Sequence, residues 1–394
     1  MILYHHRSCS IQSTYDRIVP LSKMCGITRL LDLTRLDNIG ISVYAATRPT
    51  GQLITVSNGK GATADAAKVS ALMEGIETFH AENPDPMRII YSSEESFIAN
   101  NEAFLAYESY LRSPGCLDAP SEFFSSCRQI MPWIQAKELC SNKFYYLPAS
   151  CVYYMEPFAH SFSSNGLASG NTYDEAVCHA LYECVERDAF AKIANGVLDA
   201  YSRSTYLIDP CTLPRELYDL LSGYRNAGIK TYLFAIPSLA ETHTFCCFSV
   251  SSFEEHPLLQ VSLGLGTHSF ATIAVTRAVT ECAQSRLALI HGAREDLYWP
   301  DVKIERIYQS QDRLIQWLES SQKAGLSSWS SYMNATKGFR IANSFSLQRQ
   351  SICSMLAEQG HSMIFCSELT RPEIGIDVVR IFCPTLSIDI KVLG

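Results

Sequence analysis

The sequence predicts an α+β protein in which strands and helices alternate along the chain. Short runs rich in Val, Ile, Thr and Tyr each lead through a glycine-containing segment into an apolar helical stretch, and this order occurs three times. The 394 residues are 47% hydrophobic and 18% charged, which is typical of a folded globular protein with an ample core. The repeated strand–Gly-rich loop–helix unit therefore organises the expected fold.

The first unit lies near the N-terminus. Residues 39–49 and 53–61 predict two strands, the second of which ends in the turn Asn58-Gly59-Lys60-Gly61. A helix is expected over 64–81, because the following Asn83-Pro84 pair cannot continue it.

The later elements follow the same reasoning. Thr172-x-x-Glu175 is a candidate capping box that opens a helix ending near residue 194, and residues 259–270 lead into a third helix over 272–291. The remaining expectations are an exposed Pro/Ser-rich loop at 113–126, a helical segment up to 228, strands near 230–237 and 244–252, helices at 306–325 and 347–360, a linker at 327–336 and a late core strand at 377–386.

One principal domain is expected over residues 39–388, since no interdomain linker interrupts this stretch. Residues 1–38 carry few strong signals and are expected to form an N-terminal extension or edge element, and residues 389–394 a C-terminal tail.

Composition excludes several classes of protein. A net charge of −8 and a pI near 5.7 argue against a nucleic-acid-binding surface. The 15 cysteines form no C-x-x-C pair, which favours buried thiols in a reducing compartment over disulfides or a zinc site. Neither a signal peptide nor an apolar run long enough to span a membrane occurs, so we expect a cytoplasmic protein.

Three stripes of acidic and polar residues occur at helical spacing in apolar segments, so that the members of each stripe share one helix face. They are Ser70, Glu74 and Glu77; Glu175, His179, Glu183, Glu186 and Arg187; and Arg277, Glu281 and Gln284. Like-charged carboxylates on a burying face repel one another and lose hydration unless cations compensate. Carboxylate-bound Mg²⁺ usually serves a phosphate ligand, which predicts a nucleotide-dependent enzyme.

Other interpretations stay open at this stage. The stripes could be solvated helix faces, with Glu183 and Arg187 as a surface ion pair. The turn at 58–61 could cradle phosphates or be an ordinary connection, because it does not match a P-loop. Glu77-x-x-His80 has the spacing of a di-iron ligand pair, but Glu186 and Gln284 stand where the second histidine would fall, and the intervening strands argue against a helix bundle.

Together these motifs resemble the YcaO family of ATP-dependent peptide-backbone-modifying enzymes. The resemblance lies in NGKGATADAAKVSALMEGIE, SNGLASGNTYDEAVCHALYECVERDAF and VTRAVTECAQSRLALIHGARED, and it extends over most of residues 39–388. It implies a YcaO-like fold, with mixed and antiparallel sheets packed with helices around a central nucleotide site.

The resemblance also implies roles for individual residues. It implies that Mg²⁺ ions are bound by Glu74, Glu77, Glu183, Glu186 and Glu281; that phosphates contact Lys60, Ser70 and Arg187; and that the nucleotide pocket is lined by Asn171, Glu175, Arg277 and Gln284. The chain has Glu77-Thr78 where the family often has Glu-Arg, so no basic role is expected there. The catalytic residues stay unassigned.

The family reaction adds a nucleophile to a peptide carbonyl, after which ATP phosphorylates the oxyanion and phosphate leaves. Sulfide as the nucleophile gives a thioamide, a Cys, Ser or Thr side chain an azoline, and an amine an amidine. Azoline-forming members resemble one another in a P-x-P-x-P terminus, whereas the last proline here is Pro384, so thioamidation of a ribosomally made peptide or protein is expected first. The expected partners are a TfuA-type or leader-binding protein and a second copy of the chain. A non-catalytic ATP-binding accessory protein is the alternative of another class.

Overall fold

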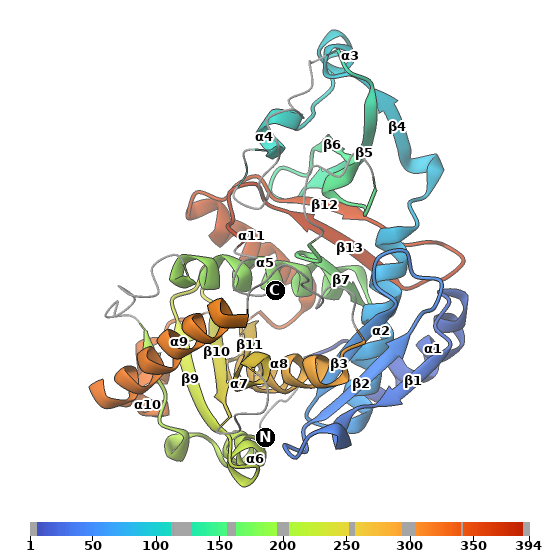
Figure 1. Cartoon of the computed structure of the whole chain (residues 1–394). Coiled ribbons are helices and arrows are strands. Elements are labelled where there is room, and N and C mark those ends of the chain that lie inside the picture. The colour runs from blue at the N-terminus through green and yellow to red at the C-terminus, as the bar shows by residue number, and fades with distance from the viewer. Residues whose placement is uncertain are drawn as a thin grey trace. The chain divides into compact units, whose positions relative to one another are not determined.

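The computed structural model describes residues 6–111, 113, 128–155, 163–194, 205–251, 257–293, 304–339 and 342–388 (Figure 1). Internal contacts divide the chain into two compact units. The first unit comprises Met1–Gly75, Ile193–Ile341 and Ile390–Gly394, and the second comprises Ile76–Lys192 and Ala342–Asp389. Both combine helices with antiparallel sheets, so the α+β prediction is confirmed. The expected C-terminal tail and nearly all of the expected Pro/Ser-rich loop lie outside the described residues.

The first unit contains two antiparallel sheets, with strand orders β1-β2-β3 and β11-β10-β9-β8. The strands are β1 Arg29–Asp32, β2 Ser42–Thr47, β3 Val56–Gly61, β8 Tyr206–Leu207, β9 Lys230–Ile236, β10 His243–Val250 and β11 Val261–His268. Its helices are α1 Ile11–Met24, the part of α2 (Ala64–Glu82) up to Gly75, α6 Arg215–Asn226, α7 Pro257–Gln260, α8 Ala271–His291, α9 Ile304–Ala324 and α10 Trp329–Ala335.

The second unit contains one antiparallel sheet with strand order β4-β5-β12-β13-β7, and β6 pairs with β5 in addition. The strands are β4 Ile89–Ser92, β5 Met131–Glu138, β6 Phe144–Pro148, β7 Leu167–Gly170, β12 Phe365–Glu368 and β13 Asp377–Phe382. The helices are α3 Glu94–Ala99, α4 Tyr107–Leu111, α5 Tyr173–Ala194, which belongs to this unit up to Lys192, and α11 Phe345–Glu358.

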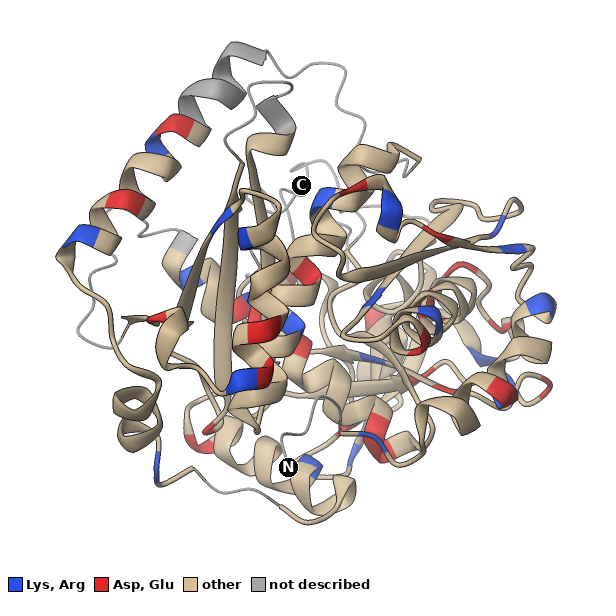
Figure 2. Cartoon of the chain, turned by 90° about the horizontal axis from the view of Figure 1, so that it is seen from below, with Lys and Arg blue, Asp and Glu red and all other residues tan. Residues whose placement is uncertain are grey.

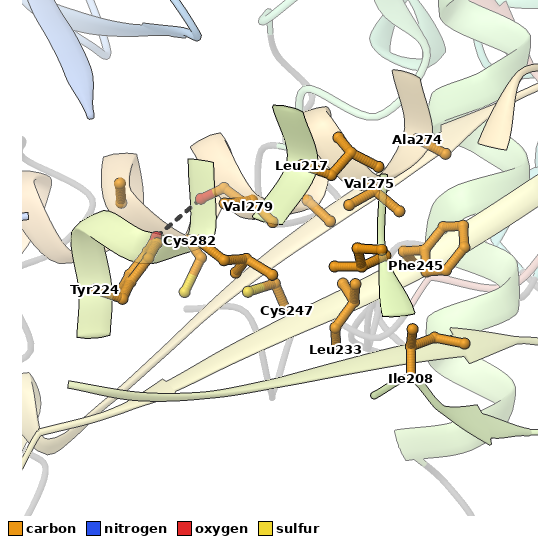
Figure 3. Packing of buried hydrophobic residues seen from close by; sticks show 14 of the residues in the cluster. Ile208, Leu217, Tyr224, Leu233, Phe245, Cys247, Ala274, Val275, Val279 and Cys282 are labelled. Carbon is orange, nitrogen blue, oxygen red and sulfur yellow. Dashed lines mark hydrogen bonds between the residues drawn. The ribbon is translucent and has the colours of Figure 1, made fainter. Parts of the chain in front are cut away.

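Helix α8 forms the core of the first unit by packing on the four-stranded sheet. Figure 3 shows Val275 and Val279 of α8 among side chains of the sheet such as Leu233 and Phe245. The hydroxyl of buried Tyr224 on α6 donates to the Val279 carbonyl oxygen at 2.8 Å. This apolar packing fixes the position of the face of α8 that carries Arg277.

The prediction of a turn at 58–61 is wrong, because these residues belong to β3. A β-carbon on Gly59 would lie 2.0 Å from the backbone nitrogen of Ala71, so the glycine allows α2 to approach the strand. Gly264 and Gly266 of β11 have the same role, since a β-carbon added at either position would lie 2.1 Å from a backbone atom of α8. The glycines therefore mark close strand–helix packing rather than loops.

One further expectation, that of a linker at 327–336, needs correction. Residues 327–336 are not a linker, because α10 begins after Ser328, whose side chain caps the helix, and the helix buries Tyr332. The N-terminal segment contains α1, and its strand β1 forms the edge of the β1-β2-β3 sheet, in agreement with the edge-element alternative expected for it.

Candidate functional site

In the first unit, the stripe on α8 contacts both β11 and β3. Oε1 of Glu281 accepts the Leu265 backbone N–H at 3.3 Å, and Oε2 forms an ion pair with the ammonium of Lys60. The side-chain amide of Gln284 donates to the backbone oxygen of Asn58. Lys60 and Glu281 thus meet although 221 positions of sequence separate them. The structure brings together three residues of the predicted set.

The Lys60–Glu281 pair refines the predicted roles of both residues. Lys60 was expected to contact phosphate and Glu281 to bind Mg²⁺, but here the ammonium itself neutralises the carboxylate. Their side chains are 21% and 16% exposed, so the pair is largely shielded from water. Lys60 therefore stands beside Glu281 as a positive charge and favours the ionised carboxylate, which is the form that binds a metal ion.

In the second unit, strand β7 positions Glu77 of α2. The backbone N–H of Ser169 donates to Oε1 of Glu77 at 2.7 Å, and the Ser169 hydroxyl donates to the same oxygen. Two donors on one oxygen stabilise the ionised carboxylate and fix its direction. Sequence reasoning missed Ser169, although it lies two residues before Asn171 in the second motif.

Helix α5 carries most of the second stripe. The predicted capping box is confirmed in part, because the Thr172 hydroxyl accepts the Glu175 backbone N–H at 3.3 Å. Oε1 of Glu175 accepts the side-chain amide of Asn171, also at 3.3 Å, so two predicted nucleotide-pocket residues are in contact. Glu186 is only 1% exposed.

The interpretation of the stripes as solvated helix faces is wrong. All twelve residues predicted to bind metal or nucleotide are buried or half-buried, including Ser70 and Glu74 on α2, Glu183 and Arg187 on α5, and Arg277 on α8. A buried acidic group needs positive charge or hydrogen-bond donors nearby. Along the described parts of the ribbon, Lys and Arg residues alternate with Asp and Glu residues rather than forming a long run of one sign (Figure 2).

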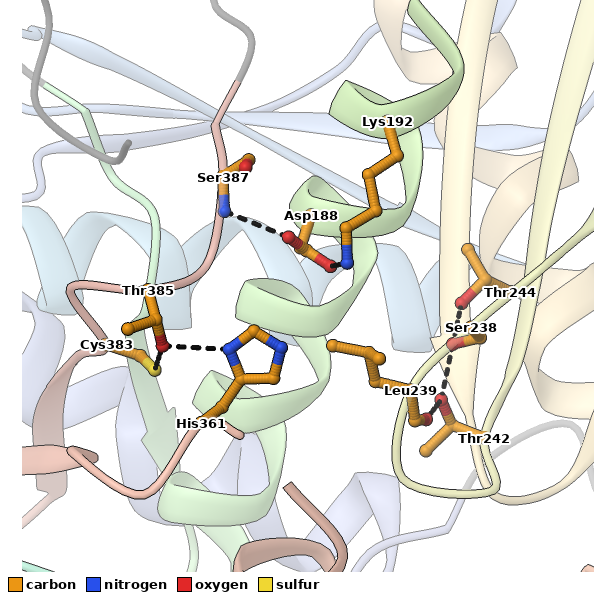
Figure 4. A network of polar contacts seen from close by, with 10 residues as sticks. All are labelled: Asp188, Lys192, Ser238, Leu239, Thr242, Thr244, His361, Cys383, Thr385 and Ser387. Atoms are coloured by element: carbon orange, nitrogen blue, oxygen red, sulfur yellow. Dashed lines mark hydrogen bonds and ion pairs between the residues drawn. The ribbon is translucent and has the colours of Figure 1, made fainter. Parts of the chain in front are cut away.

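Asp188 follows the stripe on α5, and sequence reasoning missed it. Figure 4 shows its carboxylate between two donors: the Ser387 backbone N–H at 3.0 Å and the Lys192 ammonium at 2.6 Å. Close by in sequence, the Thr385 hydroxyl contacts Nδ1 of His361 at 2.8 Å. Asp188 therefore holds the backbone at Ser387 against α5, the helix that also carries Glu186.

His80 is a buried neutral side chain. Its Nδ1 lies 2.7 Å from the Ile76 carbonyl oxygen, and burial lowers its pKa to about 4. Because a carbonyl oxygen only accepts, Nδ1 carries the proton. A hydrogen bond within its own helix explains this histidine without a di-iron site.

A carboxylate set is chemically suited to Mg²⁺, which prefers hard oxygen ligands. Glu74 and Glu281 belong to the first unit, and Glu77, Glu183 and Glu186 to the second. Within the described ranges, no group of three or more His, Cys, Asp or Glu side chains is arranged to hold a metal ion. The five glutamates stay predicted ligands, supported by their burial, by the Lys60 charge beside Glu281 and by the donors on Glu77.

The cysteines behave as expected from the sequence. All that fall in the described ranges are free thiols, and most are buried. Burial raises the pKa of the Cys366 thiol to about 12 and holds that of Cys184 well above its ordinary value. These thiols are protonated and unreactive at neutral pH.

A family model described as YcaO cyclodehydratase, binding ATP and Mg²⁺, matches residues 58–387. The chain belongs to the YcaO family. A protein of Methanothermobacter thermautotrophicus is 31% identical to it over 93% of the chain and 91% of that relative. A Rhizobium leguminosarum bv. trifolii protein, named for its place in the tfuA 3′ region, is 30% identical over 98% of the chain and 90% of its own length.

Solved structures share the fold of this YcaO protein. The structure of YcaO from Methanopyrus kandleri bound with AMPPCP and Mg²⁺ matches with a TM-score of 0.75 at 21% identity, covering 98% of this chain and 94% of the other. A heterocyclase in complex with substrate and cofactor matches with a TM-score of 0.76 at 20% identity, covering 97% and 53%. The predicted family and fold are thereby confirmed, and ATP and Mg²⁺ are the ligands given for the family. None of the helices in the described ranges is long and apolar enough to cross a membrane.

Proposed function

We propose that this YcaO protein uses ATP and Mg²⁺ to convert a backbone amide of a ribosomally made peptide or protein into a thioamide. The observation that carries the choice of product is the relative from the tfuA 3′ region, which aligns with 98% of the chain. Thioamide-forming members resemble one another in working with a TfuA-type protein, so we propose such a partner here, together with a homodimer.

The predicted site residues of this chain carry the charges and polar groups that a nucleotide with Mg²⁺ needs. Glu74, Glu77, Glu183, Glu186 and Glu281 would bind Mg²⁺ through hard oxygen atoms; Lys60, Ser70 and Arg187 would contact phosphates; and Asn171, Glu175, Arg277 and Gln284 would line the nucleotide pocket. When bound, ATP would supply the phosphoryl group that turns an amide oxygen into a leaving group, while Mg²⁺ would neutralise its charge.

Lys60 and Glu281 would change partners in this scheme. While Lys60 neutralises Glu281, the carboxylate is kept ionised and oriented by the Leu265 N–H. A divalent ion on Glu281 would compete with the ammonium for the same carboxylate, which would release Lys60 to bind a phosphate oxygen. The pair therefore reconciles the two predicted roles.

Azoline formation is the second candidate, favoured by the description of the family model as a cyclodehydratase. The two reactions share phosphorylation of the amide oxygen and differ in the nucleophile. A non-catalytic ATP-binding role is the outcome to be expected if neither product forms.

Mass spectrometry distinguishes these functions. The chain is incubated with ATP, Mg²⁺, sulfide, a TfuA-type protein and a short peptide encoded beside its gene. Exchange of oxygen for sulfur supports thioamidation, loss of one water supports the azoline, and an unchanged peptide contradicts both. Glu186→Gln should abolish turnover, whereas the matched control Glu216→Gln, on the exposed face of α6, should keep it.

A further inference from the structure

One face of the second unit's sheet carries an arginine close to the serine that orients Glu77. Strands β7 and β13 are neighbours (Figure 1), and Arg380 of β13 lies directly opposite Leu167 of β7. Alternate residues of a strand share a face, so Leu167 and Ser169 point to the same side of the sheet, and Arg380 points there with them. Arg380 is therefore the diagonal neighbour of Ser169, which donates to Glu77.

The guanidinium of Arg380 is held on two sides. Nη2 donates to the Ser163 backbone oxygen at 2.5 Å, and the group lies over the Tyr154 ring, 5.9 Å from its centroid. The Tyr154 backbone N–H donates to the Ala81 oxygen at 2.9 Å, which fixes Tyr154 to α2. Nη1, in contrast, is buried and has no hydrogen-bond partner among the described residues. The guanidinium thus keeps a fixed position and one nitrogen from which it can still donate.

An acceptor without a partner lies in the loop directly before β7. The Asn165 backbone N–H donates to the Ser163 hydroxyl at 3.1 Å, so Asn165 and Arg380 both contact Ser163. Oδ1 of Asn165 is buried and accepts no hydrogen bond within the described part of the chain. The loop is fixed to β13, because the Ile381 N–H donates to the Gly166 oxygen at 2.8 Å. An unsatisfied donor and an unsatisfied acceptor therefore flank one residue.

Ser367 of β12 adds a third such group. It is the direct cross-strand partner of Arg380 and is only 1% exposed. Its hydroxyl has no hydrogen-bond partner in the described ranges. Buried polar groups in folded proteins nearly always have a partner, so three such groups around one guanidinium indicate a site for a polar ligand.

We propose that Arg380 and Asn165 form a subsite for one backbone amide of the peptide substrate. The amide oxygen accepts from Nη1–H of Arg380, and the amide N–H donates to Oδ1 of Asn165. An amide fits because it offers one acceptor and one donor, whereas a phosphate group offers acceptors only. The subsite rests on the proposed function in one respect: the bound amide is the one that is modified.

This subsite gives Arg380 a catalytic role. When sulfide adds to the amide carbon, a C–S bond forms and the π electron pair of the C=O bond moves to the oxygen, so no atom leaves in this step. The oxygen becomes an anion, and its hydrogen bond to the guanidinium strengthens because both partners are then charged. Transfer of the phosphoryl group of ATP to this oxygen follows. Asn165 aligns the amide for the addition.

Substitution of Arg380 tests the subsite. Arg380→Met removes the donor, and Arg380→Lys keeps the charge. The Kd of ATP with Mg²⁺ is measured by calorimetry, the Kd of a fluorescently labelled copy of the peptide encoded beside the gene by anisotropy, and kcat by mass spectrometry. We expect Arg380→Met to lower kcat on the order of a hundredfold and to weaken peptide binding about tenfold, with the ATP affinity unchanged. Arg380→Lys should recover part of kcat.

Arg371→Met is the matched control. Its guanidinium also lies over an aromatic ring, that of Phe79 at 5.8 Å, but it is paired with Glu373 at 3.2 Å. This variant should keep both the peptide affinity and kcat of the wild type.

N-methylation of the peptide tests Asn165 separately. Peptides methylated at one backbone nitrogen at a time each lack one N–H. At the amide that occupies the subsite, methylation should weaken binding to the wild type about fivefold and have no further effect in Asn165→Ala. Equal losses in both proteins at every position would contradict the contact with Asn165.

The outcomes separate the subsite from the proposed function. A loss of ATP affinity in Arg380→Met as large as its loss of peptide affinity would assign the guanidinium to the nucleotide and overturn the subsite. Unchanged peptide affinity and kcat in Arg380→Met, with product formed by the wild type, would overturn the subsite, leave the proposed function standing and assign the three polar groups to bound water.

If the wild type binds the peptide but forms no product, and Arg380→Met binds the peptide more weakly, the subsite is supported and the proposed function contradicted. A wild type that binds ATP but no peptide would overturn the subsite, and one that binds neither would overturn both. Thermal unfolding checks that each variant folds, and Arg380→Gln replaces the Met variant if it does not.

Discussion

The strength of the Lys60–Glu281 ion pair can be measured, and it tests the proposed metal and nucleotide residues that belong to the first unit. Lys60→Met keeps the aliphatic stem, and Glu281→Gln keeps an acceptor for the Leu265 N–H. Exposed ion pairs contribute at most about 1 kcal/mol, whereas removing one partner of a fully buried pair costs about 3–5 kcal/mol. With side chains about one-fifth exposed, this pair lies between the two limits. We expect each single substitution to lower the free energy of unfolding by about 1–3 kcal/mol in the absence of Mg²⁺.

A double-mutant cycle isolates the interaction. Urea unfolding of the wild type, both single variants and the double variant in EDTA should give a coupling energy of about 1–2 kcal/mol. If Lys60 occupies the charge position that Mg²⁺ takes, Mg²⁺ should also raise the unfolding free energy of Lys60→Met more than that of the wild type. A coupling energy below about 0.3 kcal/mol would refute the pairing, and an equal response to Mg²⁺ would refute the exchange of Lys60 for metal.

Three further predictions follow from the packing and the buried charges. Gly266→Ala would place a β-carbon 2.1 Å from the Ala274 oxygen and force α8 away from β11, so thermal unfolding should show a loss of about 1–3 kcal/mol, and wild-type stability would contradict the close approach. His80, whose pKa falls from 6.5 to about 4 on folding, binds its proton more readily when unfolded; stability should therefore drop by up to about 3 kcal/mol as the pH falls from 6.5 to 4, and urea titrations of His80→Phe should lack this component. Asp188→Ala should destabilise by about 1–2 kcal/mol more than Asp188→Asn, which retains an acceptor for the Ser387 N–H, and equal midpoints in urea would contradict that contact.

The motif helices could be predicted because their boundaries have local causes. Asn83-Pro84 follows directly after α2, and the Thr172 cap directly precedes α5, so the expected and observed ends agree within one or two residues. The apolar surroundings of the stripes also indicated burial, and the structure confirms it for Glu186 and Glu175.

The strand glycines were misinterpreted for a physical reason. A glycine in a local sequence signals a turn, but Gly59 and Gly264 are required by helices that approach from elsewhere in the fold. Helix α10 was missed because its seven residues are too few to show helical periodicity, and its Ser-rich text is typical of a loop.

The contacts of the site could be anticipated only in part. Spacing along one helix identified Glu281, but nothing local links it with Lys60, which β3 brings to it across the fold. Likewise, Ser169 orients Glu77 across 92 positions of sequence. Spacing could predict which side chains share a helix face, whereas tertiary packing decides which donors meet them.

The most direct test of the central claim is calorimetric titration of ATP into the purified chain, first with Mg²⁺ and then with EDTA. We predict saturable binding with Mg²⁺ that is lost in EDTA and in Glu186→Gln, and kept in the exposed control Glu216→Gln. Equal binding with and without Mg²⁺, or an affinity unchanged by Glu186→Gln, would contradict the assignment of the buried carboxylates to a metal–nucleotide site.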